Sequence, residues 1–390
     1  MKIAHLSDPH ITSGPALKDQ AEDLNRIVSE VLKGSPDIVM ITGDLYGRAV
    51  PHKPSPIERA TLEQQLIRLA ECAPVYVVKG NHDHEEAFEL LSNLGGTYPV
   101  TPLSRAGSKK VYTPGGAAML YWMAYPNKNW LLADEKPRGA AEAREHAIGK
   151  IDKLLELWAT SMRQHDLPVL FMGHFQVTGA QLASGEVIST GEIEISRHRL
   201  AALPVAYGAL GHIHKCQHLD RGIMNYAGSP WVTEFGDHGE KGWIEFDTRS
   251  DAPVFRNSNT RRWVTLRYRW AGEWVEYPEE QDLKNVVVRA RLTVPDVHVA
   301  SCPWKEEISK LKAVAHRVKH EKIIEPTIRV RAPEVAASKT IPDKLESYWN
   351  ILETSPTDQL KKQALSALNE LQTMDDDQVK QLTDQITEKM

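Results

Sequence analysis

The stretch Val75-Tyr76-Val77-Val78-Lys79-Gly80-Asn81-His82-Asp83 joins an apolar strand to residue types that bind metals. Its first four residues form an apolar run, rich in β-branched valine, that is typical of a buried strand. Gly80 allows the backbone to turn sharply where this strand ends. Asn81 and His82 then stand at the carboxyl end of the strand, where open α/β sheets bind their ligands. The stretch therefore predicts both an α/β sheet and a site at its edge.

The same pattern, a strand followed by metal-binding residue types, occurs five times in the chain. The other four strands are predicted at residues 2–7, 37–42, 168–172 and 205–210. The polar residues that follow the five strands are Asp8, His10, Asp44, Asn81, His82, His174, His212 and His214. A single histidine at a strand end is usually a capping or core residue, but a fivefold repetition by chance is improbable. We therefore expect these side chains to meet at one edge of the fold.

Carboxylate, imidazole and carboxamide groups suit manganese, iron or zinc as metal ligands. No cysteine accompanies them, which argues against a structural zinc site. A pair of hydrolytic metal ions needs about seven protein ligands, with one of them shared. The predicted ligands are Asp8, His10, Asp44, Asn81, His174, His212 and His214. The sequence thus predicts a dinuclear metal centre.

The five motifs as a set resemble those of the calcineurin-like metallophosphoesterases, and in order and spacing the SbcD-type nuclease subunits within that family. They read Asp8-x-His10, Gly43-Asp44, Gly80-Asn81-His82-Asp83, Gly173-His174 and Gly211-His212-x-His214. The resemblance covers residues 1 to about 250. What it implies is a hydrolase of phosphate esters whose catalytic domain is a layered β-sandwich flanked by helices.

The resemblance also implies a role for each matching residue. One metal ion would be held by Asp8, His10, Asp44 and His214. The other would be held by Asp44, Asn81, His174 and His212. Asp44 would then bridge the two ions. His82 matches the family's non-ligand catalytic histidine, which acts near the leaving oxygen.

Two positions after the second and third motifs, Gly47 and His84, depart from the family pattern. Gly47 stands where archaeal nuclease relatives have a catalytic histidine, and where protein phosphatases of the superfamily have a second aspartate. His52 lies five residues further on and could substitute, although a surface-loop histidine is the favoured interpretation. His84 stands where the nuclease relatives more often have serine, and it is not predicted to be a ligand.

Composition sets bounds on the class of protein. The 390 residues are 25% charged and 41% apolar, which is ordinary for a globular protein with two domains and a tail. No apolar run approaches the roughly 18 residues of a membrane span, and the first strand begins too early for a signal peptide. The three cysteines show no paired spacing. We therefore expect a cytoplasmic protein that contacts no membrane.

Alternating strand and helix patterns predict an α/β fold in three parts. Residues 1–250 are the expected metallophosphoesterase domain, 255–335 a small α+β cap domain, and 343–390 a pair of amphipathic helices. The cap begins with a stretch that is rich in arginine and aromatic residues and contains no acid. Its arginines are Arg256, Arg261, Arg262, Arg267 and Arg269. They are candidates for contacts with DNA phosphates, and a solvated strand face is an equally good interpretation.

The apolar stripes of the C-terminal helices can either pack back on the chain or bind helices of a partner. The resemblance favours a partner, the coiled-coil base of an SbcC-like ATPase. It also implies a homodimer and two manganese ions. The resulting hypothesis is a metal-dependent DNA exonuclease or endonuclease in an SbcCD-like DNA repair complex. The alternatives are a phosphodiesterase or phosphatase for a small molecule, and a metal-binding scaffold for a DNA-bound ATPase.

Overall fold

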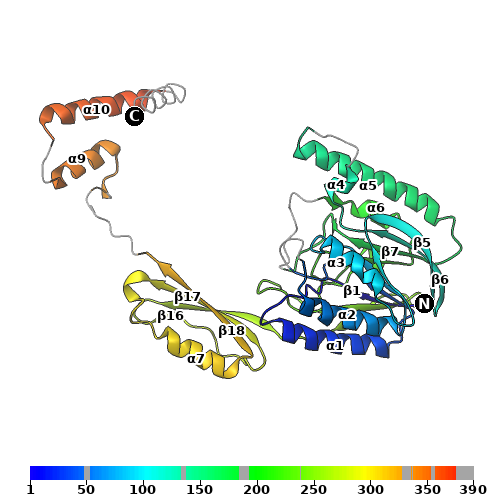
Figure 1. Cartoon of the computed structure of the whole chain (residues 1–390). Helices are drawn as coiled ribbons and strands as arrows, with labels where there is room; N and C mark the ends of the chain where they lie inside the picture. Colours follow the sequence, from blue (N-terminus) through cyan, green and yellow to red (C-terminus); the bar gives the residue numbers. More distant parts are fainter. Residues whose placement is uncertain are drawn as a thin grey trace. The chain divides into compact units, whose positions relative to one another are not determined.

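The computed structural model describes residues 1–47, 53–132, 138–183, 193–237, 239–326, 335, 337–352 and 356–374 (Figure 1). The chain forms two compact units. Unit 1 comprises Met1–Tyr268, Glu276–Leu292 and Pro303–Glu321, and unit 2 comprises Arg269–Val275, Thr293–Cys302 and Lys322–Met390. Within the described residues, no helix has the length and apolar character that crossing a membrane requires.

The first sheet of unit 1 contains the strands that the sequence predicts before the first three motifs. Its strand order is β14-β13-β1-β2-β3-β4. The strands are β14 (Val254–Asn257), β13 (Gly242–Asp247), β1 (Lys2–Leu6), β2 (Ile38–Ile41), β3 (Val75–Val78) and β4 (Val100–Leu103). Strands β1 to β4 are parallel, and β13 runs antiparallel to β1. β14, which the predicted boundary at residue 255 divides, pairs with β13 and belongs to this sheet.

The second sheet has the strand order β11-β12-β10-β7-β6-β5. Its strands are β5 (Ala106–Thr113), β6 (Gly116–Met123), β7 (Val169–His174), β10 (Tyr207–Gly211), β11 (Gln217–Leu219) and β12 (Met224–Tyr226). β6, β7, β10 and β12 are parallel, and β5 forms a hairpin with β6. A separate two-stranded ribbon pairs β8 (Gln176–Val177) with β9 (Glu194–Ile195).

Apolar side chains between the two sheets hold them face to face. The first sheet contributes Ile3, Ile38, Met40, Tyr76 and Val78, and the second contributes Leu120, Leu170, Met172, Tyr207 and Ala209. Several of these side chains are completely buried, and full burial of one such side chain stabilises the fold by about 1.5–3 kcal/mol. The sandwich of two sheets is therefore the central core of unit 1.

Helices cover the outer faces of both sheets (Figure 1). α1 (Leu17–Lys33) and α2 (Pro56–Ala70) pack on the first sheet, and α5 (Ala140–Met162) packs on the second. The buried residues of α1 recur every three or four positions, as an amphipathic helix requires. Ser55 and Glu58 form a capping box that starts α2. These four layers confirm the predicted sandwich flanked by helices.

The short helices of unit 1 lie in the connections between strands. They are α3 (Glu85–Glu89), α4 (Lys128–Leu131), α6 (Arg197–Ala201) and the 3-10 turns Leu90–Asn93 and Asp220–Gly222. α3 begins directly after the third motif, with His84 as its N-cap residue. α4 precedes the long helix α5 and lies close to it in the fold.

A third sheet follows, with the strand order β16-β15-β17-β18. Its strands are β15 (Trp263–Trp270), β16 (Trp274–Glu276), β17 (Val287–Pro295) and β18 (Arg317–Glu325). α7 (Trp304–Val314) and a 3-10 turn, Asp296–His298, lie between β17 and β18 in the sequence. Alternate residues of β17 are buried, as in a strand with one face on a core. The boundary between the two units passes through β15, β17 and β18. Residues 327–334 of the predicted cap lie outside the described residues.

The C-terminal helices of unit 2 are α9 (Ile341–Ile351) and α10 (Asp358–Thr373). The side chains of Thr340 and Thr357 cap them by accepting hydrogen bonds from backbone N–H groups of the first turn. Trp349 is buried, whereas Tyr348, Ile351 and Leu360 are exposed. Part of the predicted apolar stripe therefore faces solvent. The predicted extents of the cap and of the helical region remain predictions.

Candidate metal centre

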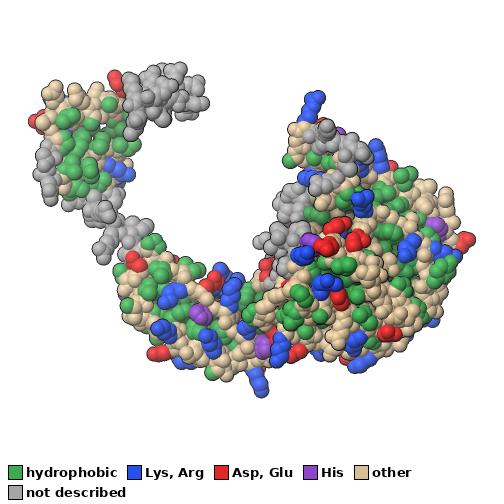
Figure 2. All heavy atoms as spheres, viewed as in Figure 1, with side chains coloured by type: hydrophobic (Ala, Val, Ile, Leu, Met, Phe, Trp, Pro, Cys, Tyr) green, Lys and Arg blue, Asp and Glu red, His purple; other side chains and the backbone are tan. Residues whose placement is uncertain are grey.

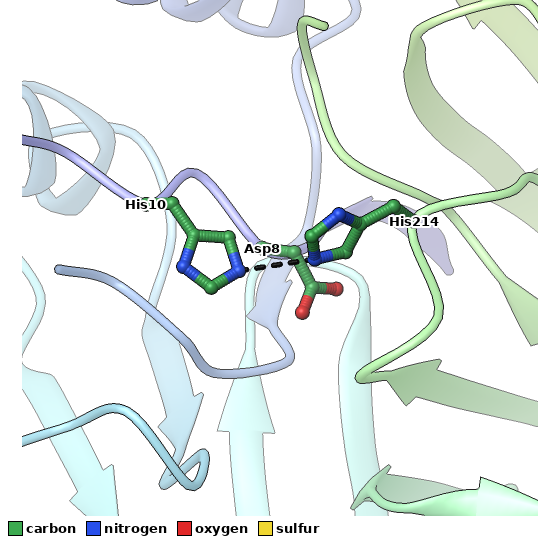
Figure 3. Close-up of side chains that lie close together, drawn as sticks. All are labelled: Asp8, His10 and His214. Atoms are coloured by element: carbon green, nitrogen blue, oxygen red, sulfur yellow. Dashed lines mark hydrogen bonds between the residues drawn. The ribbon is translucent and has the colours of Figure 1, made fainter. Parts of the chain in front are cut away.

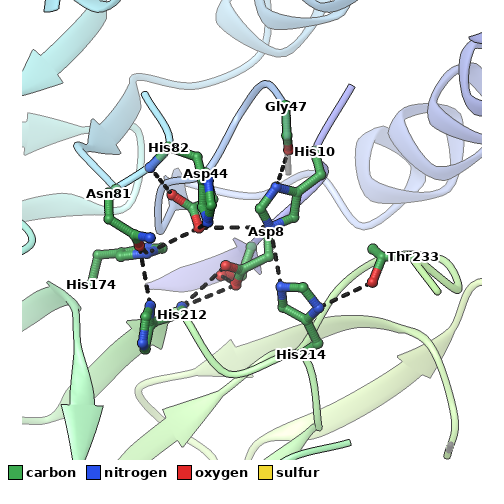
Figure 4. A network of polar contacts seen from close by, with 12 residues as sticks. Asp8, His10, Asp44, Gly47, Asn81, His82, His174, His212, His214 and Thr233 are labelled. Atoms are coloured by element: carbon green, nitrogen blue, oxygen red, sulfur yellow. Dashed lines mark hydrogen bonds and ion pairs between the residues drawn. The ribbon is translucent and has the colours of Figure 1, made fainter. Parts of the chain in front are cut away.

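The carboxyl ends of five strands from both sheets meet at one place (Figure 4). β1, β2 and β3 of the first sheet lead into Asp8, His10, Asp44 and Asn81. β7 and β10 of the second sheet lead into His174, His212 and His214. The structure thus brings together all seven residues that the sequence predicts as ligands.

These residues fall into two groups, in each of which the potential ligand atoms lie within 4.8 Å of one another. The first is Asp8, His10 and His214, in which the Nε2 atoms of the two histidines are 3.1 Å apart (Figure 3). The second is Asp44, His174 and His212. The amide oxygen of Asn81 joins the second group, 3.0 Å from Nε2 of His174 and 3.1 Å from Nδ1 of His212.

Asp44 lies between the two groups. Its Oδ2 is 3.6 Å from Nε2 of His10 in the first group. The same oxygen is 3.4 Å from Nε2 of His174 in the second group. Because one carboxylate faces both groups, Asp44 occupies the position that a bridging ligand requires.

Hydrogen bonds fix which ring nitrogen three of the histidines present to the centre. Nδ1 of His10 donates to the carbonyl of Gly47, and Nδ1 of His174 donates to the carbonyl of Thr42 at 2.6 Å. Nδ1 of His214 lies 3.1 Å from the hydroxyl of Thr233. A carbonyl oxygen only accepts, so Nδ1 carries the proton in the first two rings and the Nε2 lone pair is left for a cation. This is the orientation that outer partners impose on metal-binding histidines.

A closed ring of buried polar groups supports His214. The Thr233 hydroxyl lies 3.2 Å from Oδ2 of Asp237, and Oδ1 of Asp237 pairs with the ammonium group of Lys241. That ammonium group also donates to the carbonyl of His214 at 2.9 Å and to the Ser229 hydroxyl at 3.1 Å. Since Asp237 can only accept, the Thr233 hydroxyl donates to it and accepts from Nδ1 of His214. The ring therefore sets both the position and the tautomer of His214.

Asp83, the last residue of the third motif, connects two of the strand ends. Its carboxylate accepts hydrogen bonds from the backbone N–H groups of Asp44 at 3.0 Å, Leu45 at 2.7 Å and Gly80 at 2.8 Å. It is buried, and that burial together with the charge of Asp44 raises its pKa to about 6. Asp83 therefore holds the second and third motifs together without facing the centre as a ligand.

The backbone at the centre is held in a conformation that side chains rarely adopt. Asp8, His10, Asp44 and His212 have φ values of 49°, 44°, 52° and 93°. Such strain persists only where the surroundings enforce it, and it clusters at functional sites. Gly80 allows a further close approach, because a Cβ atom there would lie 2.1 Å from Oδ1 of Asp44.

Burial and the charges inside the centre shift the pKa values of its groups in opposite directions. Burial lowers the pKa of His10 and of His214, which favours the neutral imidazole that binds metals. Burial opposes charge at Asp44 as well, yet the charges of His174 and His10 hold its pKa well below the usual range. Against the effect of burial, Asp44 in turn raises the pKa of His174 to about 9. The donor set is thus built to hold positive charge, and a bound cation would take the place of the His174 proton.

His82 lies beside the centre. Its Nε2 is 3.8 Å from Oδ2 of Asp44, and its backbone N–H donates to Oδ1 of Asp44 at 2.9 Å. Its side chain is 17% exposed, so that a molecule bound at the centre can reach it. Neither group of potential ligands includes His82 or His84. The role of His82 as the non-ligand catalytic residue remains a proposal, and His52 lies outside the described residues.

Most of the arginines predicted to contact DNA make contacts within the chain. Arg256 pairs with Glu245 at 2.8 Å, Arg269 with Glu325 at 2.8 Å, and Arg261 with Asp19 at 3.2 Å. Arg262 is exposed and donates to the carbonyl of Asp282, and Arg267 is exposed. On the face shown in Figure 2, basic and acidic side chains are interspersed. A role in DNA binding remains a prediction. Arg262 and Arg267 are the two arginines of the set that are best placed for it, because both are exposed.

The motifs alone do not identify Thr42, Thr233, Asp237 or Lys241 as parts of the centre. Asp83 ends the third motif, but the sequence alone assigns it no role. Thr42, Thr233 and Lys241 contact the ligands, and Asp237 contacts Thr233 and Lys241. These contacts arise through tertiary structure and follow no motif spacing. The pair Asp237 and Lys241, four residues apart, also has the spacing of an ordinary surface ion pair.

Comparison with known proteins gives a consistent result. The model of the family described as calcineurin-like phosphoesterase matches residues 1–216. A protein of Staphylococcus saprophyticus, named as a subunit of the nuclease SbcCD, is 26% identical over 59% of this chain and 60% of its own length. A Staphylococcus epidermidis protein of the same name is 23% identical over 64% of this chain and 67% of its own length. The chain thus matches less than two thirds of the first relative.

Among solved structures, GAP50, described as the anchor in the inner membrane complex of Plasmodium, matches with a TM-score of 0.43 and 15% identity. That match covers 66% of this chain and 85% of the Plasmodium chain.

Proposed function

We propose that this chain, which belongs to the calcineurin-like phosphoesterase family, is a metal-dependent nuclease that hydrolyses phosphodiester bonds of DNA. The family uses a dinuclear metal centre, and the structure holds two groups of potential ligands for it. The observation that carries the proposal is the position of Asp44 between these groups. The choice of DNA over other phosphate esters is supported by the nuclease name of the two staphylococcal relatives.

The donor set fits two divalent ions, because it is made of oxygen and imidazole nitrogen and contains no thiolate. Asp8, His10 and His214 would hold one ion, and Asn81, His174 and His212 the other, with Asp44 shared. Two such ions activate water for attack on phosphorus and neutralise the charge that develops on the phosphate oxygens. Manganese is the proposed metal.

His82 is the proposed catalytic residue that acts on the leaving group. It lies at the centre without belonging to either ligand group, and it is accessible. A protonated imidazole at this position can donate a proton to the oxygen that leaves phosphorus. Nε2 of His82 lies 3.8 Å from Oδ2 of Asp44, which places the imidazole beside the proposed bridging ligand.

The wider assembly is proposed by analogy with the relatives' name, which describes one component of a complex. We propose that the chain works as a homodimer with an SbcC-like ATPase on DNA. The exposed apolar residues of α9 and α10 are the proposed contact surface for helices of that ATPase. The domain extents 1–250, 255–335 and 343–390 are part of the same proposal.

Metal analysis tests the proposed roles of the site residues. Wild-type protein reconstituted with Mn²⁺ should bind two equivalents, and Asp44→Ala should lose both, because one carboxylate serves both ions. His82→Ala should keep two equivalents and lose at least about 100-fold in hydrolysis of a small aryl phosphodiester, as expected for removal of a general acid. Circular dichroism should show an intact fold after chelation, because the sandwich core closes without metal. Loss of a full equivalent by His82→Ala would make His82 a ligand.

A further inference from the structure

A cavity of about 480 Å³ opens beside the second ligand group, and the proposed hydrolysis itself makes no use of most of its lining. Asn81, a proposed ligand, forms part of its wall, so the cavity borders the second ligand group. The lining also includes His84, Arg105, Tyr125, Asn127 and Trp130. Its volume lies within the roughly 300–1,000 Å³ of typical small-molecule sites. The cavity can therefore hold a group that is attached to a phosphate at the centre.

Two aromatic side chains line the cavity next to the metal centre. The ring of Tyr125 lies 5.7 Å from that of His212 and 6.3 Å from that of His174, measured between centroids. The backbone N–H of Tyr125 donates to the carbonyl of Lys79 at 3.0 Å, which ties this loop to the third motif. The indole N–H of Trp130 donates to the carbonyl of Tyr125 at 3.3 Å. The two aromatic residues are thus positioned together by the backbone.

The polar lining combines a cation with hydrogen-bonding groups. Arg105 is exposed, and its guanidinium makes no hydrogen bond or ion pair with another residue in the described part of the chain. Nδ1 of His84 is buried and has no hydrogen-bond partner among the described residues. The two carboxylates of the lining are already engaged, since Asp83 accepts backbone hydrogen bonds and Glu85 pairs with Lys79. Arg105 is therefore the cation that remains for an anionic ligand.

We propose that this cavity is a nucleotide subsite, which receives the nucleoside next to the phosphodiester that is cut. Aromatic side chains bind bases of any sequence through their faces, and arginine binds phosphate. Tyr125 and Trp130 would contact the base, while Arg105 would bind the next phosphate along the strand. Asn127 and His84 would hydrogen-bond to the sugar or to the base edge. This inference rests on the proposed function and specifies its substrate.

The size of the cavity has a consequence for the form of the DNA. A volume of about 480 Å³ suits one nucleotide and is too small for a base pair with its neighbours. A nucleotide whose base enters the cavity has left the base stack, which costs least where the nucleotide is already unpaired. The subsite should accordingly favour a frayed or single-stranded end over an internal, fully paired position.

The test compares wild type, Trp130→Ala and Trp130→Phe on three substrates in Mn²⁺. The first substrate is a DNA oligonucleotide, the second has an abasic residue at the nucleotide next to the cut, and the third is a bis-aryl phosphodiester without a nucleoside. Loss of one base-stacking contact should lower kcat/KM on normal DNA by about ten-fold in Trp130→Ala. Abasic DNA and the aryl ester should change less than about two-fold, and Trp130→Phe should restore most of the DNA rate.

A matched control is Lys128→Ala, because Lys128 lies on α4 with Trp130 but does not line the cavity. This variant should behave like wild type on all three substrates. Equal losses in Trp130→Ala on normal and abasic DNA would overturn the subsite, since the indole would then serve only the fold. The same conclusion would follow from an equal loss on the aryl ester.

A fourth substrate separates failure of the subsite from failure of the nuclease proposal. It is an aryl ester of a nucleoside monophosphate, which carries a base but is not DNA. If the wild type cleaves no DNA, the nuclease proposal fails. The subsite still stands if the wild type hydrolyses the nucleoside ester faster than the bis-aryl ester and Trp130→Ala hydrolyses both at similar rates. The subsite proposal is wrong if the wild type favours neither normal DNA over abasic DNA nor the nucleoside ester over the bis-aryl ester.

Discussion

At the scale of single residues, the centre depends on the groups behind the ligands as much as on the ligands. The sequence predicts all seven residues that the structure brings together, because each follows a strand that can be recognised by its apolar run. It does not predict the ring of Thr233, Asp237 and Lys241 behind His214, because that ring is assembled only by folding. The motifs likewise do not reveal that Asp8 and Asp44 have positive φ values.

The ring behind His214 should control metal affinity at the first ligand group. Asp237→Asn has one acceptor oxygen in place of two, so it cannot hold both the Thr233 hydroxyl and the Lys241 ammonium group. Loss of such outer partners typically weakens metal binding about 10- to 100-fold. We expect one of the two Mn²⁺ equivalents to bind more weakly by this factor while the other is unchanged. Calorimetric titration with Mn²⁺ measures both, and Glu240→Gln, an exposed neighbour, serves as the control. Unchanged affinities at both sites would show that the ring supports only the fold.

His5 should make the fold sensitive to acid. It is fully buried beneath the centre, hydrogen-bonded to Tyr207 and Thr42 at 3.0 Å, and burial lowers its pKa from 6.5 to about 3. Between these two values the unfolded chain binds a proton that the folded chain does not. Stability from this group is therefore complete above pH 6.5 and lost toward pH 3, by about 1.4 kcal/mol per unit.

The variant His5→Gln cannot be protonated, so it isolates this effect. Urea unfolding of the metal-depleted wild type and variant, at pH 7 and at pH 5, gives for each protein the change in the free energy of unfolding between the two pH values. The wild type should lose about 2 kcal/mol more than the variant over this interval. Equal losses would mean that His5 takes up a proton as readily in the folded chain as in the unfolded chain.

At the scale of helices and strands, prediction succeeded where an element buries a regular apolar face. The strands β1, β2, β3, β7 and β10, which lead into the five motifs, are of this kind. The sequence pattern assigns the whole arginine-rich stretch to the cap, whereas the structure divides the stretch between two sheets. Strand pairing joins residues that are far apart in the sequence, so the pattern of the stretch does not reveal this division. Its first residues pair with β13 of the first sheet, whereas β15 belongs to the third sheet.

The helices α9 and α10 should be dispensable for the metal centre. Truncation before Asp343 removes α10 and most of α9. The exposed apolar residues that are lost include Tyr348 and Ile351 of α9 and Leu360 of α10. We expect two bound Mn²⁺ equivalents, a melting temperature within about 2 °C of wild type, and loss of capture of an SbcC-like ATPase in a pull-down. A truncated chain that unfolds, or one that still captures the ATPase, would contradict the proposed role of these helices.

At the scale of the whole molecule, the two sheets of the sandwich share one site. Each sheet supplies part of the ligand set, so neither sheet could form the centre alone. The proposed nucleotide subsite lies at the same edge, in segments that follow β3, β4 and β6. The surface charge is mixed on the face in Figure 2, and therefore the choice of DNA rests on the site and the relatives rather than on net charge.

The central claim, that the two-sheet site hydrolyses DNA with metal ions, is tested by one rate measurement. Metal-depleted protein is mixed with linear DNA that has single-stranded ends, and Mn²⁺ is added with and without an SbcC-like ATPase and ATP. We predict no cleavage in chelator, cleavage on adding Mn²⁺, and a loss of at least about 100-fold in Asp44→Asn. Hydrolysis of a small aryl phosphodiester by the Mn²⁺-loaded wild type, without any cleavage of DNA under either condition, would contradict the claim.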